Sequence, residues 1–272
     1  MLRVEAIRYV TPLREGGSLP AVVDTAEAGP FAVKFRAAGQ GVKALVAECI
    51  AAGIAEALGL PIPLPAIVAL REGFGRAEPD PEIQHILRGS VGENFGLGFL
   101  SGALGFDPSV DRRLVTPDLA ANIVWFDALL SNVDRTVRNT NILVHQGQIW
   151  LIDHGAALYF HHQWSGWEQR VHSPFPQIKD HVLLPLAGDL AAADERLRPS
   201  LTESVLAGAV ADVDGEWLDE PEQFADATAH REAYVAYLTA RLNGPRAWLQ
   251  EAITARQRGP ERLGLRATHR VV

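Results

Sequence analysis

The sequence predicts an α+β protein in two lobes. A small, strand-rich lobe with one helix is expected over residues 1–70, and a larger, mainly helical lobe over residues 71–272. Short apolar segments separated by Gly and Pro open the chain, and an alanine-rich helix follows them. A loop rich in Gly and Pro then leads into long helical stretches. The chain length is sufficient for two lobes that bury a sizeable core.

Three strands are expected at the start of the first lobe. Residues 4–10 form an opening strand, and residues 21–25 and 31–36 form a hairpin about a Gly-Pro turn. Because side chains alternate along a strand, Lys34 lies on the face opposite the phenylalanines of its strand. A lone lysine there is most simply a solvated side chain on an edge strand, so its role depends on the residues that come after it in the chain.

A helix over residues 43–58 follows this strand, and it carries Glu48 in its second turn. Glu48 lies fourteen residues after Lys34. A strand lysine held by a helix glutamate is the arrangement that pairs with nucleotide phosphates in phosphoryl-transfer enzymes. The pair therefore favours a nucleotide site over an edge lysine.

The main group of chemically active residues lies between residues 130 and 155. A helix is expected to begin at Thr116, with Pro117 in its first turn, and to run to Leu130. Asp134, Asn139 and Asp153 then follow in order. One carboxylate can orient a substrate hydroxyl, while a carboxamide and a second carboxylate can hold a metal on the phosphates.

A short hairpin, residues 142–144 and 148–152, is expected to return Asp153 to the side of Asn139. Asn141 competes with Asn139 for the metal, and the spacing of five from Asp134 favours Asn139. Both aspartates could instead cap turns, because aspartate does so readily.

Two glycine-rich segments each allow more than one interpretation. The turn Gly16-Gly17-Ser18 could cover phosphates or could only supply a backbone with positive φ. Residues 90–102 resemble a dinucleotide fingerprint, but the last glycine is one place late and no apolar strand precedes it. We expect that second segment to be a packed loop. Beyond residue 160, helices are expected over residues 221–243 and 246–256.

Composition excludes some classes of protein. The net charge is −8, with a sequence pI near 5.6, which argues against a general nucleic-acid binder. The single cysteine, Cys49, allows no intramolecular disulfide and fits a reducing compartment. Since we recognise neither a signal peptide nor an apolar stretch long enough to span a bilayer, we expect a soluble, cytoplasmic protein.

The sequence resembles the HipA-like kinases, relatives of phosphoinositide kinases and protein kinases, over roughly residues 10–160. The segments that carry the resemblance are Phe31-Ala-Val-Lys-Phe-Arg36, Leu45-Val-Ala-Glu-Cys49, Ala57-Leu-Gly-Leu-Pro-Ile-Pro63, Asn132-Val-Asp-Arg-Thr-Val-Arg-Asn139 and Leu151-Ile-Asp-His-Gly155.

The resemblance implies a two-lobed protein-kinase-like fold and a kinase that uses ATP and Mg²⁺. It implies that Asp134 is the catalytic aspartate, with Arg138 beside the transferred phosphoryl group. Asn139 and Asp153 are implied as metal ligands. Lys34, Glu48 and the turn Gly16, Gly17 and Ser18 are implied as nucleotide-binding residues. His154 departs from the family, where a phenylalanine commonly follows the metal-binding aspartate.

The expected acceptor is a hydroxyl, and the resemblance favours protein serine or threonine, with a small molecule or a phosphoinositide as alternatives. A regulatory protein partner is possible. Two other functions remain open from the residues: a nucleotide-binding pseudokinase that acts as an interaction module, and a metal-dependent hydrolase built on Asp134, Asp153 and His154.

Overall fold

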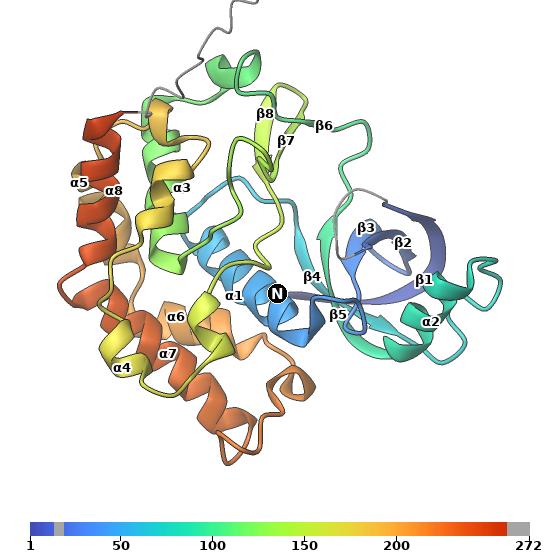
Figure 1. Cartoon of the computed structure of the whole chain (residues 1–272). Coiled ribbons are helices and arrows are strands. Elements are labelled where there is room, and N and C mark those ends of the chain that lie inside the picture. Colours follow the sequence, from blue (N-terminus) through green and yellow to red (C-terminus); the bar gives the residue numbers. More distant parts are fainter. Residues whose placement is uncertain (14–18, 260–272) are drawn as a thin grey trace, which may run out of the picture.

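A computed structural model describes residues 1–13 and 19–259. Five strands of its first part close into a small barrel (Figure 1). They are β1 (Leu2–Pro12), β2 (Ala21–Thr25), β3 (Gly29–Lys34), β4 (Pro65–Leu70) and β5 (Gly92–Gly98), in the order β1-β2-β3-β5-β4. Strand β1 pairs antiparallel with β2 and parallel with β4, which closes the barrel. The three strands expected from the sequence are therefore present, and β1 is longer than predicted.

The glycine-rich segment after residue 90 is a strand, so its interpretation as a packed loop was wrong. As β5 it pairs with both β3 and β4, which carries the barrel past the lobe boundary expected at residue 70. The reason for the glycines is packing. A Cβ built on Gly96 would lie 2.9 Å from Cγ2 of Val68 and 3.4 Å from Cβ of Phe31. Glycine is found in strands where other chain atoms approach closely.

Helix α1 (Gly41–Ala57) joins the large core of the second lobe, while α2 (Pro81–Gly89) packs against the barrel. The buried residues of α1 lie all around the helix, as expected of a helix enclosed on every side. Its crossing with a C-terminal helix is very close, because a Cβ on Gly53 would lie 2.9 Å from Cα of Ala209. The prediction that the small lobe contains one helix is not confirmed.

Helices form most of the second lobe (Figure 1). They are α3 (Pro117–Leu130), α4 (Trp167–Arg170), α5 (Leu190–Leu197), α6 (Glu203–Ala211), α7 (Ala227–Asn243) and α8 (Ala247–Arg258). One short 3₁₀ turn precedes α3, and the others lie between the helices: η1 (Asp111–Leu114), then η2 (Tyr159–His162), η3 (Pro176–Asp180), η4 (Leu184–Leu186), η5 (Arg198–Ser200) and η6 (Gly215–Leu218). A three-stranded sheet completes the lobe, with β7 (Ile142–His145) between β6 (Leu104–Gly105) and β8 (Gln148–Leu151).

The elements on either side of residues 131–141 form as predicted. Thr116 caps α3 by accepting a hydrogen bond from the main-chain N–H of Leu119, and β7 and β8 form the expected hairpin. Helix α7 is shorter than expected, because Asp226 caps it and residues 221–226 precede it as turns. Across the described residues, the helices lack the combination of length and apolar character needed to cross a bilayer.

Candidate active site

Lys34 ends β3 between two carboxylates. Its Nζ donates to Oε1 of Glu48 on α1 and to Oδ1 of Asp153, which follows β8. The predicted ion pair between Lys34 and Glu48 is therefore present. The lysine side chain is 14% exposed, whereas Glu48 is 1% exposed and Asp153 is 30% exposed. We call these three residues the cleft cluster; its Asp153 end is the part that solvent reaches.

The charges of the cleft cluster stabilise one another. Burial lowers the pKa of Lys34, but the two carboxylates more than offset this effect and leave it above its ordinary value. Burial raises the pKa of Glu48, while Lys34 and then His154 more than offset that effect and leave it well below its usual range. Nδ1 of His154 lies 3.7 Å from Oε2 of Glu48. The cluster thus holds one cation against two anions at neutral pH.

Asp134 is held by two carboxamides. Asn139 donates to its Oδ2 at 2.9 Å, and Asn141 donates to the same oxygen at 3.2 Å. Asn141 also donates to the main-chain carbonyl of Asp134 at 3.2 Å. Since each carboxamide uses its nitrogen for Asp134, its oxygen is left as an acceptor. Asn141 is buried and Asn139 is exposed.

The hairpin of β7 and β8 joins the loop of Asp134 to Asp153. Ile152, the neighbour of Asp153, donates its main-chain N–H to the carbonyl of Asn141 at 3.0 Å. Asn141 and Asp153 both have positive φ, 48° and 55°. Such backbone conformations are uncommon outside glycine and gather at functional sites.

Among the described residues, one predicted site residue, Arg138, is not brought into these contacts. Arg138 is exposed, and within the described residues it has no ion-pair or hydrogen-bond partner. Gly16, Gly17 and Ser18 lie outside the described residues.

The residues at the site fit a magnesium ion bound together with phosphates. Mg²⁺ prefers oxygen ligands and is commonly held by one or two carboxylates plus substrate phosphates. Asp153 offers a partly exposed carboxylate, and Asn139 and Asn141 offer amide oxygens. The described part of the chain has no group of three or more His, Cys, Asp or Glu residues able to hold a metal by themselves. A metal here would be completed by ligands from outside the chain, such as phosphate oxygens or water.

A second group of charges, beneath the site, was not predicted from the sequence. Arg135 forms an ion pair with Asp127 on α3, with 2.6 Å between Nε and Oδ2. His181 contacts the same carboxylate, with its Nε2 2.9 Å from Oδ2. We call Asp127, Arg135 and His181 the sealed cluster, because their side chains are between 0% and 2% exposed. One indication in the sequence that Arg135 could belong to the site was its position directly after Asp134.

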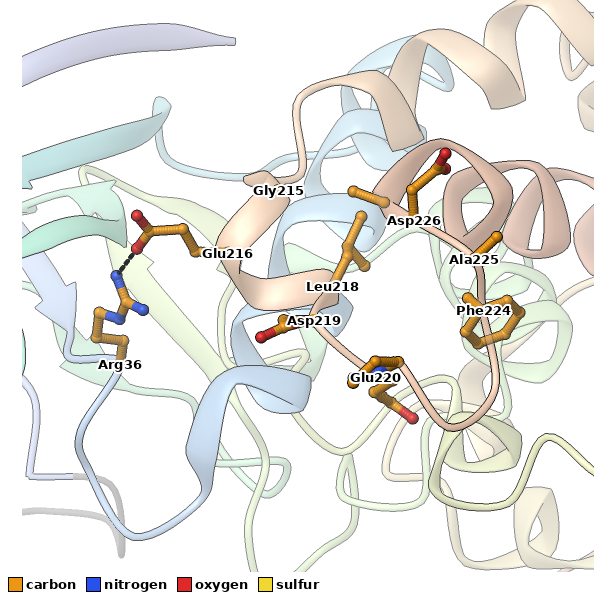
Figure 2. A pocket seen from close by; sticks show the side chains of 11 residues that line it. Arg36, Gly215, Glu216, Leu218, Asp219, Glu220, Phe224, Ala225 and Asp226 are labelled. Carbon is orange, nitrogen blue, oxygen red and sulfur yellow. Dashed lines mark hydrogen bonds and ion pairs between the residues drawn. The ribbon is translucent and has the colours of Figure 1, made fainter.

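A hollow of about 410 Å³ lies apart from these residues, between the end of β3 and the segment before α7 (Figure 2). Arg36 lines it and pairs with Glu216. Asp219, Glu220 and Asp226 add three more carboxylates to its lining. This negative charge is unsuited to a polyphosphate. The hollow is therefore not a candidate phosphate site.

Comparisons with known proteins identify the fold and the family. The solved structures similar to this chain include the proinflammatory kinase CtkA of Helicobacter pylori, with a TM-score of 0.53 and 13% identity. The match covers 93% of this chain and 99% of that chain, and at this identity it shows the fold. No curated protein sequence matches the chain. A family model described as HipA-like kinase matches residues 7–250. The chain thus has a mixed α/β kinase fold, is a phosphotransferase, and belongs to the HipA-like kinase family.

Proposed function

We propose that this kinase transfers the γ-phosphoryl group of ATP, with Mg²⁺, to a hydroxyl group of a protein serine or threonine. The observation that carries the proposal is the cleft cluster. Lys34 lies between a buried helix glutamate and a partly exposed aspartate. Nucleotide phosphates can take the place of one of those anions, because a lysine cation can pair with phosphate as with carboxylate.

Each residue has a proposed role. Lys34 pairs with the nucleotide phosphates, and Glu48 holds the lysine in position. Asp153 and Asn139 hold Mg²⁺, with Asn141 as the alternative carboxamide. A bound Mg²⁺ supplies positive charge that neutralises the phosphates. We assign phosphate contacts to Gly16, Gly17 and Ser18 from the family resemblance.

Asp134 accepts the hydrogen bond of the acceptor hydroxyl and orients it for attack. Its hydrogen bonds from Asn139 and Asn141 hold the carboxylate in a fixed position and leave its second oxygen for the acceptor. Arg138 is exposed and follows Asp134 by four residues in the chain, and we propose that it contacts the transferred phosphoryl group. A serine or threonine hydroxyl is the proposed acceptor; a small molecule and a phosphoinositide are the alternatives that an acceptor screen would separate.

The test compares Asp134→Asn with Asp153→Ala. We expect Asp134→Asn to slow transfer by about 10²–10⁴-fold, because acid–base assistance is lost, while nucleotide binding persists. We expect Asp153→Ala to lose both transfer and the stabilisation by Mg²⁺ and ATP. Ligand at roughly a hundred times its dissociation constant stabilises a fold by about 2.7 kcal/mol, so this loss is measurable as a missing rise in melting temperature.

Melting curves and transfer of labelled phosphate are measured on both variants, after each is shown to be folded without ligand. Transfer at the wild-type rate by Asp134→Asn would disprove the catalytic role of Asp134. Full magnesium-dependent stabilisation of Asp153→Ala would disprove the metal site.

A further inference from the structure

Arg135 is buried directly beside the proposed catalytic aspartate. Its guanidinium Nη1 donates to the main-chain carbonyls of Asn141 and of Ile152, the latter at 3.3 Å. Its Nε donates to Asp127 at 2.6 Å. A guanidinium is planar and rigid, so its donors fix the relative positions of the groups that accept from them.

The two carbonyls lie just before the start of β7 and just after the end of β8, next to the proposed site residues. Asn141 precedes β7 and donates to Asp134, while Ile152 follows β8 and precedes Asp153. Arg135 itself follows Asp134 in the chain. A single guanidinium therefore connects the loop of Asp134, the carboxamide that holds it, and the residue next to Asp153.

The other two residues of the sealed cluster, Asp127 and His181, fix the position of Arg135. Asp127 also accepts a hydrogen bond from Asn132 at 2.8 Å. Nδ1 of His181 accepts from the main-chain N–H of Leu183 at 3.0 Å, so the ring proton lies on Nε2 and points to Asp127. The main chain adds a further contact, because Val182 donates to the carbonyl of Arg135 at 3.0 Å.

We propose that Arg135 is a positioning residue: through the carbonyls of Asn141 and Ile152, it sets the distance between the Asp134 carboxylate and the Asp153 metal ligand. This inference rests on the proposed phosphoryl transfer. It assigns no contact between Arg135 and the substrate. Its consequence is that a change at Arg135 alters metal binding and turnover while the nucleotide contacts of Lys34 are kept.

A second buried arginine provides a matched control. Arg241, which is 2% exposed, donates to the main-chain carbonyls of Leu129 and Ala128 at the end of α3, at 2.7 and 3.1 Å. It further donates to the carbonyl of Val171 at 3.0 Å. Arg241 is thus an equally buried arginine that binds carbonyls, but those carbonyls do not flank Asp153 or Asn141. Its replacement should affect stability without altering the site.

The experiment compares Arg135→Lys with Arg241→Lys. Both substitutions keep the charge and lose the rigid, forked donor arrangement. Three quantities are measured: kcat and KM for ATP, the affinity for Mn²⁺ in the presence of a non-hydrolysable ATP analogue, read by electron paramagnetic resonance, and the melting temperature. For Arg135→Lys we expect a fall in kcat of about 10²-fold, as for a misplacement of about 1 Å, and weaker Mn²⁺ binding with KM nearly unchanged. For Arg241→Lys we expect a lower melting temperature with kcat and Mn²⁺ affinity of the folded protein within about twofold of wild type.

The outcomes separate the two proposals. Wild-type protein that shows neither transfer nor metal-dependent stabilisation would overturn the proposed function and this inference with it. If the wild type is active and Arg135→Lys behaves like Arg241→Lys, the positioning role alone is overturned. Should Arg135→Lys fail to fold, His181→Gln replaces it, because glutamine can still donate to Asp127. We then expect a smaller loss in the same direction, in kcat and Mn²⁺ affinity; wild-type values for both would disprove the inference.

Discussion

The cleft cluster and the sealed cluster both place one cation against carboxylates, but they differ in access to solvent. In the cleft cluster the Asp153 side chain is 30% exposed, so its contact with Lys34 can be exchanged for a ligand. In the sealed cluster Asp127 and Arg135 are 0% exposed and have protein partners on several sides. The difference indicates that the cleft cluster can exchange a partner for a ligand, whereas the sealed cluster keeps its partners.

Removing the anion of the sealed cluster should have the largest effect on stability. Asp127→Ala leaves Arg135 buried without its carboxylate, and breaking a buried pair in this way costs about 3–5 kcal/mol. We expect this loss in the free energy of unfolding measured by urea denaturation. The matched change in the cleft cluster, Asp153→Ala, should cost at most about 1 kcal/mol, because that contact is partly exposed. Equal losses for the two variants would show that the clusters do not differ as described.

Removing the cation of the cleft cluster should instead affect turnover. Lys34→Met takes away the positive charge that is proposed to pair with the phosphates, and the loss of one such electrostatic contact costs about 10²–10³ in kcat. Lys43 provides the control, because it is a half-buried lysine that pairs with Glu220 at 3.0 Å outside the cleft cluster. Steady-state transfer by Lys43→Met should stay within about twofold of wild type. A comparable fall for both lysines would remove the special role of Lys34.

The smallest predicted effect is a difference in pH dependence. Burial lowers the pKa of His181 below its ordinary value, even though Asp127 opposes this effect. The neutral ring therefore contributes stability that is present above about pH 6.5 and is lost as the pH falls below it, at up to about 1.4 kcal/mol for each unit of pKa shift. Glu48 has a lowered pKa and Lys34 a raised one, so their contributions are lost only below pH 4.5 and above pH 10.5.

Melting temperature measured from pH 5 to pH 8 tests this difference, with His181→Gln as the control. Because His161 and His230 also have lowered pKa values, the relevant quantity is the difference in slope between wild type and variant. We expect a flatter curve for His181→Gln. Identical slopes would show that His181 does not titrate in this range.

The sequence predicted those parts of the site that depend on local patterns. The cap at Thr116, the hairpin after Asn141, and the pair of Lys34 and Glu48 follow from spacing over a few residues and from side-chain alternation. The implied roles of Asp134, Asn139 and Asp153 remain proposals.

The other features depend on contacts between distant segments. From the sequence alone, Arg135 is expected to be a surface residue. It is buried because Asp127 of α3 and His181 of a later segment form a cluster with it. The glycines of β5 suggested a loop, because the approach of Val68 to Gly96 exists only in the closed barrel. The assignment of α1 to the small lobe is not confirmed for a similar reason, since its main packing partner is α6 from the far end of the chain, while it also contacts β5 of the barrel.

The close contact between Gly53 and Ala209 has a mechanical consequence. Because the separation leaves no room for a Cβ on Gly53, we expect α1 and α6 to move as one body, so that Glu48 moves with the helical lobe. Lys34 belongs to the barrel, whereas both of its carboxylate partners then belong to the other body. A rotation that parts the barrel from the helices must therefore withdraw the lysine from both carboxylates at the same time. In this kinase, Lys34 would resist such a hinge motion together with the other links between barrel and helices, such as the pair of Arg36 and Glu216.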